Sequence, residues 1–171
     1  MISLIVAVSK NMDKEECNIC DWIARINVDE QKYFIAELET GYIFLSSEWQ
    51  YFRGYTFFIS KLHVSEIHLM PVEFRKQFLF EMTIVSEAVQ NVFKAVKMNC
   101  ESLGNSCSHV HWHIIPRYEN DPLPDKAIWN IDRKIIESVT LSDDELLKMQ
   151  RDLISKIKEL AISYKIKATF I

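Results

Sequence analysis

The stretch "CSHVHWHIIPRY", Cys107 to Tyr118, decides the fold, because it joins the pattern of a half-buried strand to three histidines at alternate positions. Successive side chains of a strand point to opposite faces of a sheet. His109, His111 and His113 therefore share one face, while the apolar residues between them share the other. The pattern predicts an imidazole row facing a cleft and a hydrophobic core behind it.

Four further strands are predicted on the N-terminal side of this stretch. Three runs of aromatic and β-branched residues read "KYFIAEL" from Lys32, "GYIFLS" from Gly41 and "YTFFIS" from Tyr55. The "ETG" between the first two is typical of a hairpin turn. The fourth run, "KMNCESLG" from Lys97, would be joined to the histidine strand by a short turn at Gly104 and Asn105.

A long helix is predicted between the third and fourth of these strands. After Pro71, apolar residues recur at spacings of four and three, as helical packing on a sheet requires: Phe74, Phe78, Met82, Val85, Val89, Val92 and Val96. The patterns together predict an α+β fold in which a five-stranded antiparallel sheet has one long helix packed on one face.

The C-terminal part is predicted to be a surface loop followed by an amphipathic helix. In "LSDDELLKMQRDLISKIKEL", Ser142 and Glu145 have the spacing of a capping box. One stripe then carries the apolar side chains of Leu146, Met149, Leu153, Ile157 and Leu160. We expect a single domain over residues 1–171, with a core at about 17–121 and the C-terminal loop and helix at 122–171.

Composition narrows the classes of protein. The 171 residues are 49% hydrophobic with a net charge of −4. The sequence has no long basic run, which argues against a nucleic-acid polymer or a membrane as partner. The apolar run Ile2 to Val8 is too short to cross a bilayer and is predicted to be a strand or an N-terminal arm. Without secretory features, the four cysteines favour the reducing cytoplasm: Cys17, Cys20, Cys100 and Cys107.

Three interpretations of the histidine row stay open from the residues alone. It could be a polar face of a sheet, or a zinc site, since two histidines at i and i+2 of a strand can bind one zinc ion. In the third interpretation, one neutral imidazole attacks phosphorus while its neighbours hold its tautomer and contact phosphate oxygens.

"HVHWHII" resembles the signature of the histidine triad (HIT) superfamily of nucleotide hydrolases and transferases. The similarity extends through "CNIC", "ELETGYIFL", "GYTFFISKLHV", "KMN", "GNS" and "HIIPRY", in the order found in its diadenosine-polyphosphate-hydrolase-like branch. It covers about residues 17–121. The resemblance implies an enzyme of this family, acting on a dinucleoside polyphosphate or another nucleotide with an α-phosphate ester, anhydride or amide, without an organic cofactor and commonly as a homodimer.

The resemblance also implies roles for single residues. His111 would attack the α-phosphorus and form a nucleotidyl-imidazole intermediate that water then cleaves. His109 and His113 would orient His111 and contact phosphate oxygens, and Asn99 would orient the network. A phosphorylase, in which inorganic phosphate replaces water, has the same residues, and a nucleotide-binding regulatory protein without hydrolysis is the alternative function.

Nucleotide contacts are implied for two further segments. Asn105 and Ser106 match the family's polar turn beside the phosphates and the leaving group. Where the family usually has an acidic or amide residue for the ribose hydroxyls, this chain offers Ser46 or Ser47, with Glu48 as a substitute.

Cys17 and Cys20 form a C-x-x-C with three interpretations: packing, a redox pair, or half of a zinc site. Some bacterial relatives bind a structural zinc through such a pair, a histidine that ends the third strand, and the first histidine of the triad. The resemblance therefore implies a structural zinc site of Cys17, Cys20, His63 and His109. A catalytic zinc ion held by all three triad histidines is the rival arrangement.

Other side chains have weaker predictions. Arg117 and Lys61 are candidates for phosphate contact, with a solvated face as the other interpretation. The aromatic residues Trp49, Tyr51 and Phe52 either stack a base or pack in the core.

Overall fold

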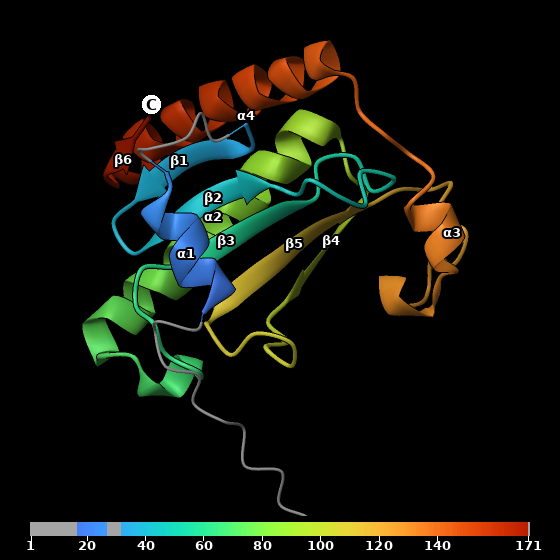
Figure 1. Ribbon diagram of the computed structural model, residues 1–171. Coiled ribbons are helices and arrows are strands. Elements are labelled where there is room, and N and C mark those ends of the chain that lie inside the picture. The colour runs from blue at the N-terminus through green and yellow to red at the C-terminus, as the bar shows by residue number, and fades with distance from the viewer. Residues whose placement is uncertain (1–16, 27–31, 171) are drawn as a thin grey trace, which may run out of the picture.

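The computed structural model describes residues 17–26 and 32–170, and its centre is an antiparallel sheet in the order β4-β5-β3-β2-β1-β6 (Figure 1). The strands are β1 Phe34–Leu38, β2 Gly41–Leu45, β3 Thr56–Ser60, β4 Lys97–Glu101, β5 His111–Arg117 and β6 Ala168–Thr169. The predicted α+β class is confirmed, and all five predicted strands form. The two-residue β6 is a sixth strand that the sequence pattern missed.

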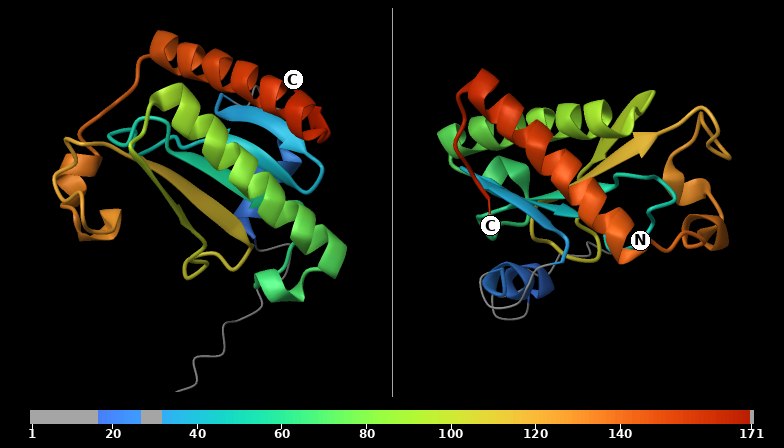
Figure 2. Two further views of the ribbon diagram at one scale, coloured as in Figure 1. Left: turned by 180° about the vertical axis from the view of Figure 1, so that it is seen from behind. Right: turned by 90° about the horizontal axis from the view of Figure 1, so that it is seen from above.

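Helices cover both faces of this sheet. They are α1 Asn18–Ala24, α2 Val72–Phe93, α3 Arg133–Ile136 and α4 Asp143–Tyr164, with 3-10 turns η2 Ile67–Leu69 and η3 Ile128–Asn130. The long helices α2 and α4 lie on one face, and α1 lies on the other (Figure 2). None of the described helices has the length and apolar composition that a bilayer crossing requires. The run Ile2 to Val8 lies outside the described residues.

The predicted stripe of α2 is confirmed except at its end. Phe78, Val85 and Val89 are buried against the sheet. The helix stops at Phe93, because Lys94 adopts a left-handed backbone with φ 59°. Val96 therefore lies beyond the helix and is 57% exposed, so its assignment to the stripe was wrong.

The capping box predicted for α4 is confirmed. The backbone N–H of Glu145 donates to Ser142 Oγ at 3.3 Å, and the backbone N–H of Ser142 donates to Glu145 Oε2 at 3.0 Å. Every residue of the predicted apolar stripe is buried in the core that α4 shares with α2 and the sheet: Leu146, Met149, Leu153, Ile157 and Leu160. Local capping and tertiary burial thus agree in this helix.

A buried carboxylate ties α2 to the β1–β2 turn. Glu81 is fully buried and accepts hydrogen bonds from the backbone N–H groups of Glu39 at 3.1 Å and Thr40 at 3.0 Å. The amide of Gln77 donates a third at 3.0 Å. The carboxyl oxygens are thus hydrogen-bonded by peptide and amide groups in place of water.

The face opposite α2 and α4 has two small apolar clusters with a space between them. One lies under α1 and contains Ile26, Phe34, Phe44 and Ile59, with Trp22 packed against it. The other lies under the η3 and α3 segment and contains Phe52, Tyr55, Ile115, Ile128, Ile131 and Ile136. His111 and His113 line the region that both clusters border, with Ile59 of the first cluster and Tyr55 of the second beside them.

The histidine strand begins later than predicted. β5 starts at His111, and its connection from β4 spans residues 102–110 in place of a short turn. Val110 pairs with the end of β3 and the segment after it, because its N–H donates to Val64 O at 2.9 Å and its carbonyl accepts from Ser60 N at 3.1 Å. His109 therefore lies just before the strand. The expected alternation holds beyond it, since Ile114 is in the main core and His111 and His113 line the other face.

Candidate active site and metal cluster

A cavity of about 590 Å³ lies on the imidazole face of the sheet. Its lining comes from α1, the loop after β2, strand β3, the turn before His109, strand β5 and η3. The side chains that line it include Trp22, Ser46, Ser47, Glu48, Trp49, Tyr55, Phe57, Asn105, Ser106, Cys107, His111, His113 and Trp129.

His111, His113 and Tyr55 form one hydrogen-bonded chain. His111 Nδ1 lies 2.7 Å from His109 O, and a carbonyl only accepts, so Nδ1 of His111 holds a proton. In the neutral imidazole, Nε2 of His111 then presents its lone pair to Nε2 of His113, which is 3.1 Å away and must donate. Nδ1 of His113 in turn accepts from the Tyr55 hydroxyl at 2.5 Å. One proton arrangement therefore satisfies the whole chain.

Burial keeps these imidazoles neutral at pH 7. It lowers the pKa of His111, which the hydrogen bond to the His109 carbonyl raises by a smaller amount. Burial and the neighbouring His111 lower the pKa of His113 to about 4. Burial, with the nearby Glu101 carboxylate, raises the pKa of Tyr55, so its phenol remains protonated and can donate.

Tyr55 is a site residue that the sequence reasoning missed. It is 1% exposed and lies two residues before Phe57, which pairs with His113 in the β3–β5 ladder. Residues two apart share a face of a strand, so Tyr55 points to the same face as His113. The alternation of "GYTFFIS" contained this signal, but only the β3–β5 register shows which histidine Tyr55 reaches.

Two tryptophans form the wall near His113. Their rings lie 5.4 Å apart, and that of Trp129 lies 5.7 Å from the His113 ring. Trp129 Nε1 donates to Glu101 Oε2 at 2.5 Å. Trp49 adopts a left-handed backbone with φ 59°, a conformation that non-glycine residues rarely hold outside functional or strongly constrained sites.

The predicted aromatic cluster divides between the site and the core. Trp49 lines the cavity, whereas Phe52 is fully buried, with Tyr51 packed against its cluster. The loop that carries them is folded around Gln50, whose amide donates to Ser46 O at 2.8 Å and accepts from Gly54 N at 3.0 Å.

The predicted nucleotide-contacting residues meet in this cavity. Ser46 and Ser47 line it from the loop after β2, and Asn105 and Ser106 line it from the turn before His109. Ser46 is buried and its Oγ accepts from Glu48 N at 3.3 Å, while Ser47 is exposed.

Asn99 and Arg117 pair with each other outside the cavity lining. Arg117 Nη1 donates to Asn99 Oδ1 at 2.8 Å, and neither residue is part of the cavity wall. Arg117 is 4% exposed and forms a buried ion pair with Asp121 at 2.5 Å. It also donates to the backbone carbonyls of Leu123 and Lys126.

The prediction that Arg117 is a solvated or phosphate-contacting side chain was wrong, because its donors are occupied by the loop that follows β5. That loop leads to η3, so Arg117 fixes the path of the segment bearing Trp129. Lys61, the other predicted phosphate contact, pairs with Glu37 at 2.6 Å and does not line the cavity.

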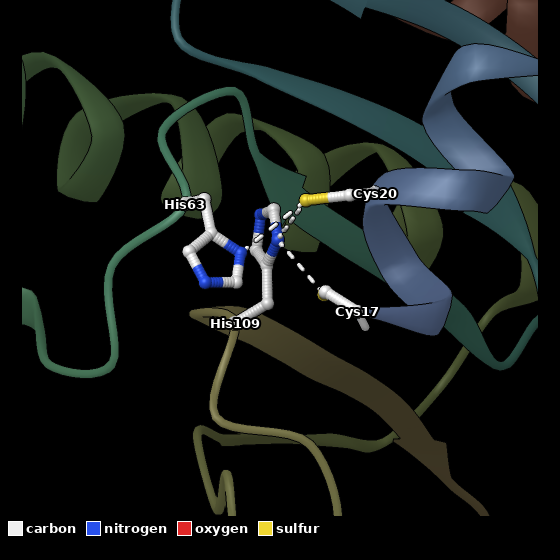
Figure 3. A group of neighbouring side chains, drawn as sticks. All are labelled: Cys17, Cys20, His63 and His109. Atoms are coloured by element: carbon white, nitrogen blue, oxygen red, sulfur yellow. Dashed lines mark hydrogen bonds between the residues drawn. The ribbon is translucent and has the colours of Figure 1, made fainter. Parts of the chain in front are cut away.

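A second group of side chains could hold a metal ion. Cys17, Cys20, His63 and His109 place one ligand atom each within 4.8 Å of one another (Figure 3). The cysteines come from the start of α1, His63 from the segment after β3, and His109 from the segment before β5. Of the triad histidines, only His109 belongs to this group.

The geometry of the group fits tetrahedral zinc. Cys20 Sγ lies 3.3 Å from His63 Nδ1 and 3.4 Å from His109 Nδ1, and Cys17 Sγ lies 3.7 Å from His109 Nδ1. Zinc bonds of about 2.3 Å to sulfur and about 2.05 Å to nitrogen give sulfur–nitrogen edges of about 3.5 Å in a tetrahedron. His109 Nε2 lies 2.7 Å from Ser60 O, so this nitrogen donates and Nδ1 is left as the ligand atom.

The chain is similar to proteins of one family. A sequence model of the HIT domain matches residues 28–120, more than half of the chain. "Protein hit" of Bacillus subtilis strain 168 is 28% identical over 109 residues, which are 61% of this chain and 72% of that protein.

Solved structures share the fold. A histidine triad protein from Marinobacter aquaeolei VT8 superimposes with a TM-score of 0.64 at 22% identity, covering 78% of this chain and 97% of that one. A zinc-bound histidine triad family protein from Mycobacterium smegmatis superimposes with a TM-score of 0.60 at 18% identity, covering 88% and 99%. With the domain match and the histidine strand, the chain belongs to the HIT domain family.

Proposed function

We propose that the chain is a nucleotide hydrolase or transferase in which His111 attacks the α-phosphorus of its substrate. The supporting observation is the hydrogen-bonded chain from Tyr55 through His113 to His111. It leaves the lone pair of His111 on Nε2, the nitrogen that faces His113 in the cavity wall. An uncharged imidazole at pH 7 is the form that can act as a nucleophile.

In the first step, Nε2 of His111 forms a bond to phosphorus and the bond from phosphorus to the leaving group breaks. The imidazole becomes positively charged, and the carbonyl of His109 stabilises this charge by accepting from Nδ1–H. His113 Nε2–H, released from His111 by the new bond, would donate to a phosphate oxygen or to the departing group.

In the second step, water attacks the same phosphorus and loses a proton to the solvent. The nitrogen–phosphorus bond breaks, and its electron pair returns to Nε2 of neutral His111. Inorganic phosphate could take the place of water, and the reaction would then be a phosphorolysis. An imidazole serves both steps because it is a competent nucleophile and, once bonded to phosphorus, a good leaving group.

The lining of the cavity favours substrates with little phosphate charge. Among the described residues that line it there is no lysine or arginine, and Glu48 adds a carboxylate. The donors available to phosphate oxygens are neutral: Asn105, Ser106 and the histidines. We therefore expect nucleotide α-phosphate esters and amides to be better substrates than dinucleoside polyphosphates, with Ser46 or Ser47 contacting the ribose.

The cysteine and histidine group is proposed to bind a structural zinc ion. Cys17, Cys20, His63 and His109 would supply a Cys₂His₂ set that fastens α1 to the ends of β3 and β5. The ion would fix the His109 carbonyl that orients His111. A catalytic zinc held by all three triad histidines is disfavoured, because His111 and His113 bond to each other, to Tyr55 and to the His109 carbonyl.

A nucleotide-binding regulatory protein without hydrolysis is the second candidate. It is supported by the side chain of Asn99, which accepts a hydrogen bond from Arg117. In an active enzyme of the family, the resemblance implies that this side chain orients the histidines. We further propose a cytoplasmic location and a homodimer. The outer edge of β4 and the exposed apolar residues Leu79 and Phe80 of α2 are the surfaces that support a dimer.

A substrate panel with two variants tests the proposed enzyme. Nucleoside phosphoramidates, nucleotide esters and dinucleoside polyphosphates are incubated with the wild type, with His111→Asn and with His68→Asn, a histidine of η2 outside the cavity lining. We expect turnover by the wild type and His68→Asn and none by His111→Asn, which still binds nucleotide. Tight binding without turnover of any substrate by the wild type would favour the regulatory alternative.

A further inference from the structure

Cys107 is a thiol that neither the proposed chemistry of His111 nor the proposed zinc site uses. It is half-buried and lines the cavity beside Asn105 and Ser106. Its Sγ atom lies 3.9 Å from Sγ of Cys17, which belongs to the metal-binding group. The two thiols are 90 positions apart in the sequence and meet only in the folded chain.

We propose that Cys17 and Cys107 are an oxidisable pair, a modification site at which a hydroperoxide forms a disulfide and displaces the zinc ion. The displacement rests on the proposed zinc site. The disulfide requires only the two thiols, so it can be tested whether or not zinc is bound.

The positions of the two residues permit the bond. A disulfide is about 2.05 Å long, so the sulfur atoms would have to approach by about 1.9 Å. Neither residue is held in a strand: Cys17 is the N-cap residue of the seven-residue helix α1, and Cys107 lies in the 102–110 connection. Cys100, by contrast, is fixed in β4, and its thiol bonds Ser86 Oγ at 3.4 Å.

The cavity gives a small oxidant access to Cys107, whereas Cys17 is 1% exposed. The sulfur of Cys107 attacks one hydroperoxide oxygen and the oxygen–oxygen bond breaks, giving a sulfenic acid and water or an alcohol. The sulfur of Cys17 then attacks the sulfur of Cys107, and hydroxide leaves and takes up a proton as water. Two electrons thus pass from the two sulfur atoms to the peroxide. The two protons come from both thiols in the zinc-free protein; when Cys17 is a zinc-bound thiolate, one comes from Cys107 and the other from water.

Zinc would be lost in the second step. Once the sulfur of Cys17 is bonded to Cys107, it no longer offers a thiolate, and Cys20, His63 and His109 are left as ligands. A structural zinc site depends on its full set of four protein ligands. The disulfide would also link the cavity-lining turn of Asn105 and Ser106 covalently to the start of α1.

The test oxidises zinc-loaded, reduced full-length protein with hydrogen peroxide. Released zinc is followed with a chromogenic chelator, and disulfides are mapped by mass spectrometry after trypsin digestion. The Cys100→Ser variant is the matched control. In this variant the tryptic peptide 98–117 contains a single cysteine, Cys107. Fragmentation of peptide 15–25 then shows whether Cys17 or Cys20 is the cross-linked residue.

We expect a Cys17–Cys107 cross-link together with zinc release in the wild type and in Cys100→Ser. Cys107→Ser should give no such cross-link and should release zinc at least about tenfold more slowly. Equal zinc release from Cys107→Ser, or a disulfide between Cys17 and Cys20 in its place, would overturn the proposal. If Cys107→Ser does not fold, Cys107→Ala replaces it. If the purified protein holds no zinc, the peptide map alone decides.

Discussion

Tyr55→Phe removes a single oxygen atom from the proposed site. The Tyr55 hydroxyl donates to His113 Nδ1 at 2.5 Å, and without it the buried nitrogen has lost its donor. His113 can then take the tautomer with hydrogen on Nδ1, in which two lone pairs face each other across the 3.1 Å between the Nε2 atoms of His113 and His111. The population of the Nε2–H tautomer of His113, which supplies the donor required in the proposed first step, would fall.

The size of the effect follows from the hydrogen bond. Leaving a buried acceptor unpaired costs about 1–3 kcal/mol, and we expect the free energy of unfolding to fall by an amount in that range. The same energy applied to the tautomer equilibrium lowers kcat by about 5- to 150-fold, since about 1.4 kcal/mol is a factor of ten. KM should change little, because the Tyr55 hydroxyl bonds His113 Nδ1 and, in the proposed mechanism, the imidazole and not the phenol would contact the phosphate.

The assay combines steady-state kinetics on the fastest substrate of the panel with ¹⁵N NMR of the histidine tautomers. Tyr118→Phe is the matched control, because the Tyr118 hydroxyl donates to Arg53 O outside the cavity lining. It should lose stability without losing kcat. The reasoning is refuted if Tyr55→Phe keeps both its kcat and the Nε2–H tautomer of His113.

The other predictions concern stability. The pKa of His113 is held at about 4, below its ordinary 6.5, so the unfolded chain binds a proton more readily than the folded chain. The free energy of unfolding should therefore be highest above pH 6.5 and fall by about 3 kcal/mol towards pH 4. Urea unfolding at a series of pH values should show a smaller fall with decreasing pH for His113→Asn than for the wild type. Glu81→Gln should lower the free energy of unfolding by about 1–3 kcal/mol, because the NH₂ group that replaces one carboxylate oxygen cannot accept from the backbone N–H that this oxygen binds; a loss below about 0.5 kcal/mol would contradict this. Chelation of zinc, or Cys20→Ser, should lower the melting temperature, and His68→Ala should not; an unchanged melting temperature with zinc removed would rule out a structural ion.

Periodic patterns predicted most of the fold. The alternation in "HVHWHII" placed His111 and His113 on one face and Ile114 in the core, and the capping box and stripe of α4 matched at every position. These features depend on neighbours two to four residues apart, which a sequence displays directly. The two-residue β6 was missed because it has too few residues to show any period.

The parts of the site that were missed depend on tertiary register. Tyr55 meets His113 only through the β3–β5 ladder, and Trp129 reaches it through a loop that Arg117 holds. Arg117 was predicted to be solvated or to contact phosphate because it is charged. The sequence around it does not indicate that its partner Asp121 is buried with it. The C-x-x-C motif suggested a metal, but the histidine ligands came from the family resemblance alone.

The most direct test of the central claim is to trap the covalent intermediate. Substrate labelled with ³²P in the α-phosphate is mixed with enzyme, quenched after a fraction of a turnover, and the labelled peptide is sequenced. The proposed mechanism predicts an acid-labile, alkali-stable label on His111 that appears and decays at rates consistent with kcat, and no label in His111→Asn. Turnover without any labelled histidine, or a label on another residue, would contradict it.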